Sequence, residues 1–299
     1  DEQRGVVQNE KRQGENRPFG RVFESVLRAS FPPGHPYRWL PIGSMEDLNA
    51  ATLDDVHEWF RTFYGAANVV LVLAGDIDVA TAREKAQKYF GHIAPGPGLD
   101  RPGTWVAART ESTREIMHDQ VAQTRLHRFW NTAPDGSLDA ELLSIVGQIL
   151  GGGKTSRLYE RLVYREQMAD TVNAGLSGFE IAGLFGITAD VKAGVPHARV
   201  EAAIDEEVKR FIAKGPTEAE LARARTAIRA GFVKGLERIG GFGGKADVLA
   251  ACEVFEGDPG CYRRSLQVLE SATPEQLREA AQRWLAQGDY TLEVHPVPR

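Results

Sequence analysis

The sequence is poor in the residues that mark several common kinds of catalytic or metal site. It has only two cysteines, Cys252 and Cys261, which could pair or stay free. Their spacing matches no metal-binding motif, and two cysteines are too few to diagnose a redox compartment. The seven histidines form no H-x-x-x-H or H-x-x-E-H motif. No G-x-S-x-G nucleophile elbow occurs either. Taken alone, the sequence therefore contains no complete active site.

An excess of positive charge and long apolar runs are also lacking. The net charge is −5, so no basic surface for nucleic acid is expected. The longest apolar run, NVVLVLAG at 68–75, has the length of a buried strand and is far too short to span a membrane. The length of 299 residues suffices for two domains with cores of their own.

Helical and strand patterns along the chain predict an α+β fold with a mostly antiparallel sheet. Helices are expected from the start to about Gly14, over 21–30, 52–65, 80–91, 138–150 and 157–167, after Pro196, and from Thr217 and Thr273. Strands are expected over 68–75, 124–130, 171–178, 183–191 and 290–295. The Pro- and Gly-rich segment 96–104 is the predicted linker between a first domain, 1–95, and a second domain, 105–299.

An internal repeat suggests that the two domains share one fold. Residues 273–295 can be laid on residues 52–74 without gaps, so that Thr273 falls on Thr52 and Leu277 falls on Val56. Each copy reads as a capped helix, a glycine break and a strand. The second domain would then be nearly complete, and the first would lack its N-terminal part.

Two glycine-rich segments invite a nucleotide-binding interpretation that their context does not support. In GGGKTS at 151–156, the first glycine of a Walker A loop is replaced by Gln148, and a helix precedes the loop where a phosphate loop follows a strand. GGFGG at 240–244 lacks the strand–turn–helix setting of a dinucleotide fingerprint. We expect this second segment to mark a hinge or a break between helices.

One acidic residue near the start, Glu10, is unusually placed. Val6, Val7 and Glu10 stand at positions i, i+1 and i+4, so they share one face of the predicted first helix. A carboxylate that points toward a core needs a cation, hydrogen-bond donors or a metal. From spacing alone, the favoured alternatives are an ion pair with a nearby Arg and a carboxylate that leans into solvent.

The order of several motifs resembles a known family. The matching stretches are 6–20 (VVQNEKRQGENRPFG), 35–78, 88–93 (KYFGHI) and 149–167 (ILGGGKTSRLYERLVYREQ). Together they resemble the zinc-bearing half of a pitrilysin-like, or insulinase-like, M16 metallopeptidase truncated at its N-terminus. The resemblance implies two related domains, of which the first is incomplete.

The resemblance also implies the chemistry. The family uses an inverted H-x-x-E-H motif, in which two His bind zinc and the Glu is the general base, with a later Glu as third ligand. By resemblance that third ligand is Glu10, and the H-x-x-E-H helix would lie upstream of Asp1. The intact protein would be a zinc metalloendopeptidase acting on peptides or unfolded segments in a chamber closed by a complementary M16 half. This chain alone, without catalytic residues, would be inactive and would not hold zinc.

Three positions depart from patterns found in some relatives. Gln3 stands where a further acidic residue can occur, and Val163 and Asp170 stand where an Arg and a Tyr can hold the substrate. Such Arg–Tyr pairs belong to the half without zinc, so their absence fits the zinc half. The alternative function is a non-catalytic M16-like scaffold or substrate-presenting subunit, and a third is a peptide-binding module that uses sheet edges. The sequence leaves the compartment open, with periplasm and secretion among the alternatives.

Overall fold

The computed structural model describes residues 2–297 and divides the chain into two compact units. Unit 1 comprises residues 1–45, 104–228 and 268–299, and unit 2 comprises residues 46–103 and 229–267. The predicted linker at 96–104 contains the change from unit 2 to unit 1 at residue 104. The division into domains 1–95 and 105–299 stays a prediction.

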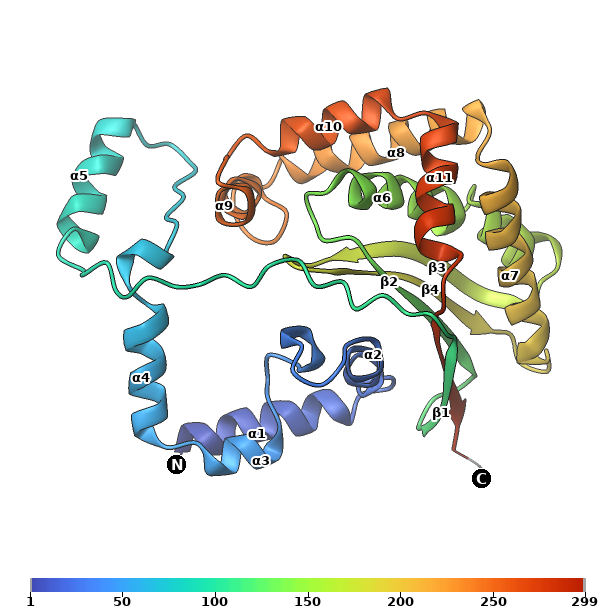
Figure 1. The fold of residues 1–299 in the computed structure, drawn as a ribbon, viewed down its shortest axis with the longest axis horizontal. Coiled ribbons are helices and arrows are strands. Elements are labelled where there is room, and N and C mark those ends of the chain that lie inside the picture. Colours follow the sequence, from blue (N-terminus) through green and yellow to red (C-terminus); the bar gives the residue numbers. More distant parts are fainter. Residues whose placement is uncertain (1, 298–299) are drawn as a thin grey trace. The chain divides into compact units, whose positions relative to one another are not determined.

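Unit 1 is built on one five-stranded sheet with the strand order β1-β5-β2-β4-β3 (Figure 1). Its strands are β1 (Thr113–Asp119), β2 (Arg125–Thr132), β3 (Ala169–Gly178), β4 (Gly183–Val191) and β5 (Tyr290–Pro296). β1 pairs with β5 in parallel, whereas the other three pairings are antiparallel. The predicted α+β class with a mostly antiparallel sheet is confirmed.

Helices cover both faces of this sheet. α2 (Val22–Ser30) packs on one face, where Val26 and Leu27 meet Leu292 and Val294 of β5 in a common apolar cluster. The opposite face carries helices that pack against the strands and against one another: α6 (Leu138–Gly151), α7 (His197–Lys214) and α11 (Pro274–Leu285) (Figure 1). Unit 1 also contains α1 (Glu2–Glu15), a 3-10 turn at Pro36–Arg38 and a π-helical segment at Tyr159–Arg165. The sheet therefore has a hydrophobic core on each side.

Unit 2 is helical. It holds α4 (Leu53–Phe63), a 3-10 turn at Ala66–Asn68, α5 (Val79–Phe90) and α9 (Lys245–Glu256). Three helices cross the boundaries between the units: α3 (Met45–Ala50), α8 (Glu218–Gly235) and α10 (Tyr262–Ser271). No helix within residues 2–297 is both long enough and apolar enough to cross a lipid bilayer.

The predicted helix starts are confirmed by their caps. The Thr52 hydroxyl accepts a hydrogen bond from the Asp55 backbone N–H at 3.2 Å, and the Asp55 carboxylate accepts one from the Thr52 N–H at 2.7 Å. The Thr217 hydroxyl accepts from the Glu220 N–H at 3.2 Å, and α11 begins with the same kind of box at Thr273. GGFGG forms the predicted break between α8 and α9, with Gly241 and Gly243 at positive φ.

The buried strand predicted at 68–75 is wrong. Residues 69–75 form no strand, and Val69, Leu71 and Leu73 are exposed. A strand needs a neighbour to accept its hydrogen bonds, and within residues 2–297 the only sheet belongs to unit 1. β1 and the helices α3, α9 and α10 are, in turn, elements that the sequence patterns did not predict.

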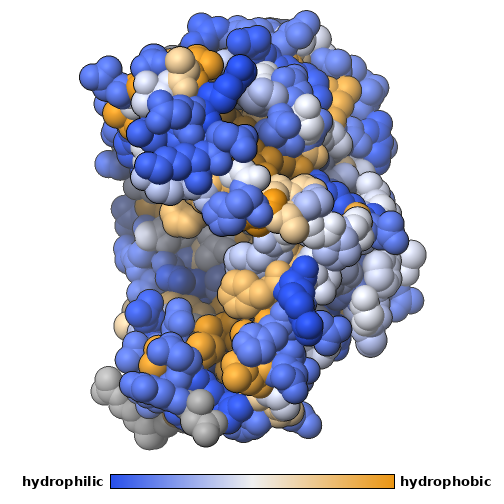
Figure 2. Space-filling view, turned by 90° about the vertical axis from the view of Figure 1, so that its left-hand side faces the viewer, coloured by the Kyte–Doolittle hydropathy of each residue, from blue (hydrophilic) through white to orange (hydrophobic). Residues whose placement is uncertain are grey.

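Residues 46–103 leave their apolar side chains uncovered. Gly65 is the only buried residue in this stretch, although α4 alone carries Trp59 at 58% exposure and Phe60 at 50%. Figure 2, which views the side on which α4 and α5 are drawn in Figure 1, shows apolar residues at the surface there. Soluble proteins seldom expose so many large apolar side chains together unless another surface covers them.

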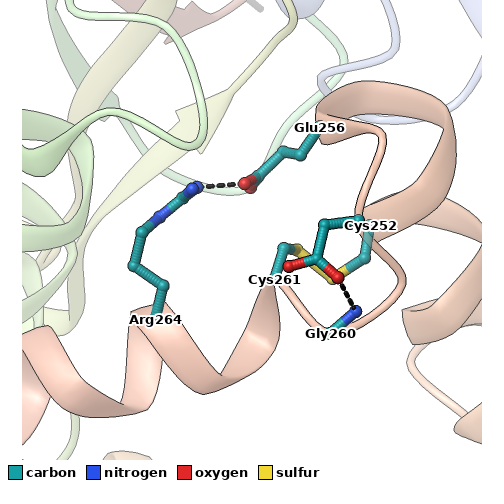
Figure 3. Close-up of a disulfide and its surroundings, with 6 residues drawn as sticks. Cys252, Glu256, Gly260, Cys261 and Arg264 are labelled. Carbon is teal, nitrogen blue, oxygen red and sulfur yellow. Dashed lines mark hydrogen bonds and ion pairs between the residues drawn. A yellow bond between two sulfur atoms is a disulfide. The ribbon is translucent and has the colours of Figure 1, made fainter.

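The two cysteines, whose state the sequence left open, form a disulfide within unit 2. Cys252 of α9 is bonded to Cys261, which directly precedes α10 (Figure 3). The short loop between the two helices is further held by a hydrogen bond from the Gly260 N–H to Asp258 at 2.8 Å. Arg264 also forms an ion pair with Glu256 across the same loop (Figure 3).

Candidate functional site

Glu10, the predicted metal ligand, lies in the third turn of α1 and is exposed. Val6 on the same helix face is 54% exposed and Val7 is half-buried, so the face is open rather than packed on a core. The Glu10 carboxylate forms no hydrogen bond or ion pair with any residue that the structure describes. The carboxylate was expected either to pair with a nearby Arg or to lean into solvent. Within residues 2–297 the ion pair is absent.

Glu10 is one of the residues that line a cleft in unit 1. The cleft has a volume of about 280 Å³, and its lining includes Glu10, Gln13, Arg17 and Leu40. The neighbouring residue Lys11, rather than Glu10, is the buried ionic residue of α1.

Lys11 forms one ion pair within α1 and one that joins α1 to α2. Its Nζ atom lies 2.9 Å from Glu15 Oε1 and 3.8 Å from Glu24 Oε2 of α2. The pair with Glu24 links α1 to α2 at the residue that follows Glu10. Periodicity gave no indication of the buried lysine, because its burial depends on the contact with a second helix.

The described residues do not complete a zinc site around Glu10. Zinc takes four ligands, and a catalytic zinc site supplies three of them from the protein. Within residues 2–297, one group of three His, Cys, Asp or Glu side chains is close enough to share an ion, and Glu10 is not in it. Glu10 is thus an unpaired single carboxylate that lacks companions for a metal in this part of the chain.

The GGGKTS segment serves packing and turn formation. A Cβ atom at Gly151, the last residue of α6, would lie 2.1 Å from the backbone nitrogen of Ala174 in β3. Only glycine permits so close an approach of helix and strand. Gly153 has a φ of +92°, a turn conformation that L side chains rarely adopt. The rejection of a nucleotide site agrees with this geometry, since a helix does precede the loop.

The residues at the positions of the expected Arg and Tyr do not form a common substrate-binding site. Val163 is half-buried within the π-helical segment, and Asp170 is exposed on β3. The Asp170 carboxylate accepts a hydrogen bond from the Gln123 side chain at 3.0 Å. Gln3 is exposed in the first turn of α1. None of the three offers a charged donor to a substrate.

Two buried histidines, His35 and His127, form hydrogen bonds within the fold. His35 is fully buried, with Nε2 at 2.8 Å from the Trp105 carbonyl oxygen and Nδ1 accepting from the Tyr37 N–H at 3.0 Å. His127 of β2 has Nδ1 at 3.0 Å from the Thr188 hydroxyl. Burial, reinforced by the neighbouring charge of Arg125, lowers the pKa of His127 from 6.5 to about 4.

The group of metal-ligand type that the structure brings together is His197, Glu293 and His295. Sequence reasoning missed it, since His197 is remote in sequence from the other two. Glu293 and His295 are two positions apart on β5, so their side chains lie on the same face of the sheet. This spacing could have indicated two of the three ligands from the sequence. The third member could not be predicted without knowing that α7 begins beside this strand.

Comparisons with known proteins agree with the fold. Residues 50–228 match the family model described as the peptidase M16 inactive domain. The zinc protease PqqE of Helicobacter pylori is 26% identical over 247 residues, covering 79% of this chain and 54% of that protein. An uncharacterized zinc protease of Mycobacterium leprae is 26% identical over 284 residues, covering 89% of this chain and 59% of that protein. The crystal structure of a protease from Helicobacter pylori superimposes with a TM-score of 0.86 at 20% identity, over 98% of this chain and 70% of that one.

The chain belongs to the peptidase M16 family, because the family model covers more than half of it. The resemblance inferred from its sequence motifs is confirmed. The chain spans between a half and three-fifths of the length of the two curated relatives named above. What those zinc proteases do as whole proteins is therefore a matter of proposal for this chain.

Proposed function

We propose that this chain is part of a zinc-dependent M16 endopeptidase in which Glu10 is a metal ligand. The observation that carries the proposal is the unpaired, exposed Glu10 carboxylate, which lines a cleft and lies on a helix that the Lys11–Glu24 ion pair joins to α2. The names of the curated relatives as zinc proteases support the same chemistry. The substrates would be peptides or unfolded segments, enclosed in a chamber.

The remaining ligands and the general base would come from an H-x-x-E-H segment outside the 299 residues. One carboxylate is too few ligands to retain zinc, so residues 1–299 alone would be inactive and metal-free at the Glu10 position. We accordingly derive no catalytic step from the residues present.

The uncovered apolar surface of residues 46–103 supports the proposal that further polypeptide packs on unit 2. Large side chains such as Leu53 and Trp59 are 69% and 58% exposed, and burying them would be favourable. The completing segment of the first M16 domain is the proposed occupant. A complementary M16 half, as a second chain or a further repeat, would supply the substrate-holding Arg and Tyr that Val163 and Asp170 do not replace.

The Cys252–Cys261 disulfide bears on the compartment. Disulfides persist in oxidising environments such as the bacterial periplasm and the extracellular space, and they are rare in the reducing cytosol. We therefore favour periplasm or secretion over the cytosol. Determining whether these thiols are oxidised in protein isolated with alkylation from its native host would test this assignment.

The proposal is tested with Glu10→Gln in the full-length gene product. Gln keeps the size of the side chain but removes the charge that binds zinc, so we expect the zinc content to fall by one ion per chain and peptidase activity to fall at least tenfold, while the thermal unfolding midpoint in zinc-free buffer is unchanged. Glu2→Gln is the matched control, since Glu2 is an exposed glutamate on the same helix. Unchanged zinc stoichiometry in Glu10→Gln would contradict the ligand role.

The upstream sequence of the gene decides between the peptidase and the non-catalytic alternative. An H-x-x-E-H motif within about one domain's length before Asp1 is expected. If that segment lacks the motif, the peptidase proposal fails and the scaffold function takes its place.

A further inference from the structure

Three side chains converge at one end of the unit 1 sheet, where β5 meets the first turn of α7. His197 is the first residue of α7, and Glu293 and His295 project from β5 toward the same side. His197 Nε2 lies 3.2 Å from Glu293 Oε2, and His295 Nε2 lies 2.9 Å from the same oxygen. We propose that His197, Glu293 and His295 bind a divalent transition-metal ion.

The spacing of the donor atoms fits such an ion. One donor atom from each of the three residues can be chosen so that all lie within 4.8 Å of one another. Zinc binds nitrogen and carboxylate oxygen at about 2.0–2.2 Å, so neighbouring ligands of a tetrahedral site lie roughly 3.3 Å apart. The two nitrogen–oxygen separations are already close to that value, and small side-chain rotations would bring all three donors onto one ion.

The donor types select the class of metal. Two imidazole nitrogens and one carboxylate suit zinc, copper, nickel or cobalt, whereas magnesium and calcium prefer oxygen ligands. The site is accessible, because the side chains of His197 and His295 are 40% and 21% exposed. Three protein ligands leave a fourth position that water can fill.

The charges around the site favour the binding of a cation. Glu293 is only 3% exposed, and its Oε1 atom pairs with Arg114. The same guanidinium also pairs with Glu201, one turn after His197 on α7. One positive charge is thus shared by two carboxylates, and a net negative charge remains beside the histidines. A buried carboxylate with this surplus is stabilised by a metal ion.

Contacts with Thr124 and Arg114 already orient two of the ligands. His295 Nδ1 lies 3.1 Å from the Thr124 hydroxyl oxygen, which can accept a hydrogen bond from Nδ1–H and so leave Nε2 free for a metal. Arg114 holds the other carboxylate oxygen, so that Oε2 faces the two imidazoles. Metal-binding histidines are commonly supported in this way, through the ring nitrogen that does not bind the metal.

Calorimetric titration of the 299-residue chain with zinc chloride tests the proposal. We expect one zinc ion per chain, displaced poorly by magnesium. His197→Ala and His295→Ala are each expected to weaken binding at least tenfold. His118→Ala is the matched control, because the His118 ring lies 6.0 Å from that of His295 on the adjacent strand and is not among the ligands. Its affinity should stay within about twofold of the parent chain.

Histidine NMR of the unmodified chain gives a second test that depends on no variant. Zinc should shift the ring resonances of His197 and His295 and leave those of His57 and His92 unchanged. Absence of zinc binding by the parent chain would overturn the proposal, and so would equal affinity of the His197→Ala/His295→Ala double variant or shifts confined to other histidines. Since Glu10 takes no part, Glu10→Gln should bind the same single ion, which separates this result from the test of the proposed function.

Discussion

Protonation of His127 is expected to destabilise unit 1 in mildly acidic solution. His127 is 6% exposed on β2, and its Nε2 atom is buried without a hydrogen-bond partner in the described part of the chain. A proton on this ring would therefore place a charge inside the protein beside Arg125, and the attraction of Asp190 offsets only part of that cost. The native state holds the ring neutral at pH values at which the unfolded chain already binds a proton.

The magnitude follows from the change in pKa. The pKa of His127 falls from 6.5 to about 4 on folding, a difference of about 2.5 units. Each unit corresponds to about 1.4 kcal/mol, so the full effect is about 3 kcal/mol. Because the unfolded state binds more protons between pH 6.5 and 4, the contribution is present above pH 6.5 and is lost as the pH falls toward 4.

Urea unfolding of the parent chain and of His127→Phe at pH 7 and pH 4 measures this effect. Phe fills the same ring volume but cannot titrate, so the parent chain should lose about 3 kcal/mol more unfolding free energy than the variant over this interval. His57→Gln, at an exposed position on α4, serves as the control and should follow the parent chain. Equal losses in the parent and His127→Phe, or an NMR titration of His127 near pH 6.5, would refute the reasoning.

Two further predictions concern packing and the disulfide. Gly151→Ala places a methyl group against the Ala174 backbone and should cost about 1–3 kcal/mol of unfolding free energy in urea, whereas Gly231→Ala, in open space on a helix, should not destabilise. Cys252→Ser opens a loop whose ends are 9 residues apart and should cost about 2–3 kcal/mol in unit 2. Reduction should lower the stability of the parent chain to that of the Cys252→Ser variant and leave the variant unchanged; an equal response of both would contradict a bond to Cys261.

Local chemistry made much of unit 1 predictable. The starts of α8 and α11 were found because Thr217 and Thr273 cap free backbone N–H groups there. Strands β2, β4 and β5 were found because apolar, β-branched and aromatic residues concentrate in them. These signals act within a few residues and need no knowledge of the rest of the fold.

The candidate metal site could not be predicted from such local signals. The pattern Glu293-x-His295 places two ligands on one face of a strand, but His197 precedes Glu293 by 96 positions along the chain. The surroundings of Glu10 could not be predicted for the same reason. Periodicity predicted which residues share its helix face. The residue of α1 that is buried against α2, however, is Lys11, which forms an ion pair with Glu24 of α2. Side chains brought together by tertiary packing leave no regular spacing in the sequence.

The internal repeat separates what a segment determines from what its surroundings determine. Both copies begin with a capping box, at Thr52 and at Thr273, so the helix start depends on local residues. The following segments differ.

In the second copy, Leu292 and Val294 are fully buried in β5, between β1 and β2. Their counterparts in the first copy, Leu71 and Leu73, are 49% and 47% exposed in a segment with no paired neighbour among residues 2–297. An apolar run of strand length thus becomes a strand only where a sheet accepts its hydrogen bonds and a core covers its side chains. The proposed completing segment would have to supply both to residues 68–75, and amide hydrogen exchange of Leu71 and Leu73 should slow from nearly unprotected in this chain to strongly protected in the full-length protein. Equal exchange in both would refute the proposed packing on unit 2.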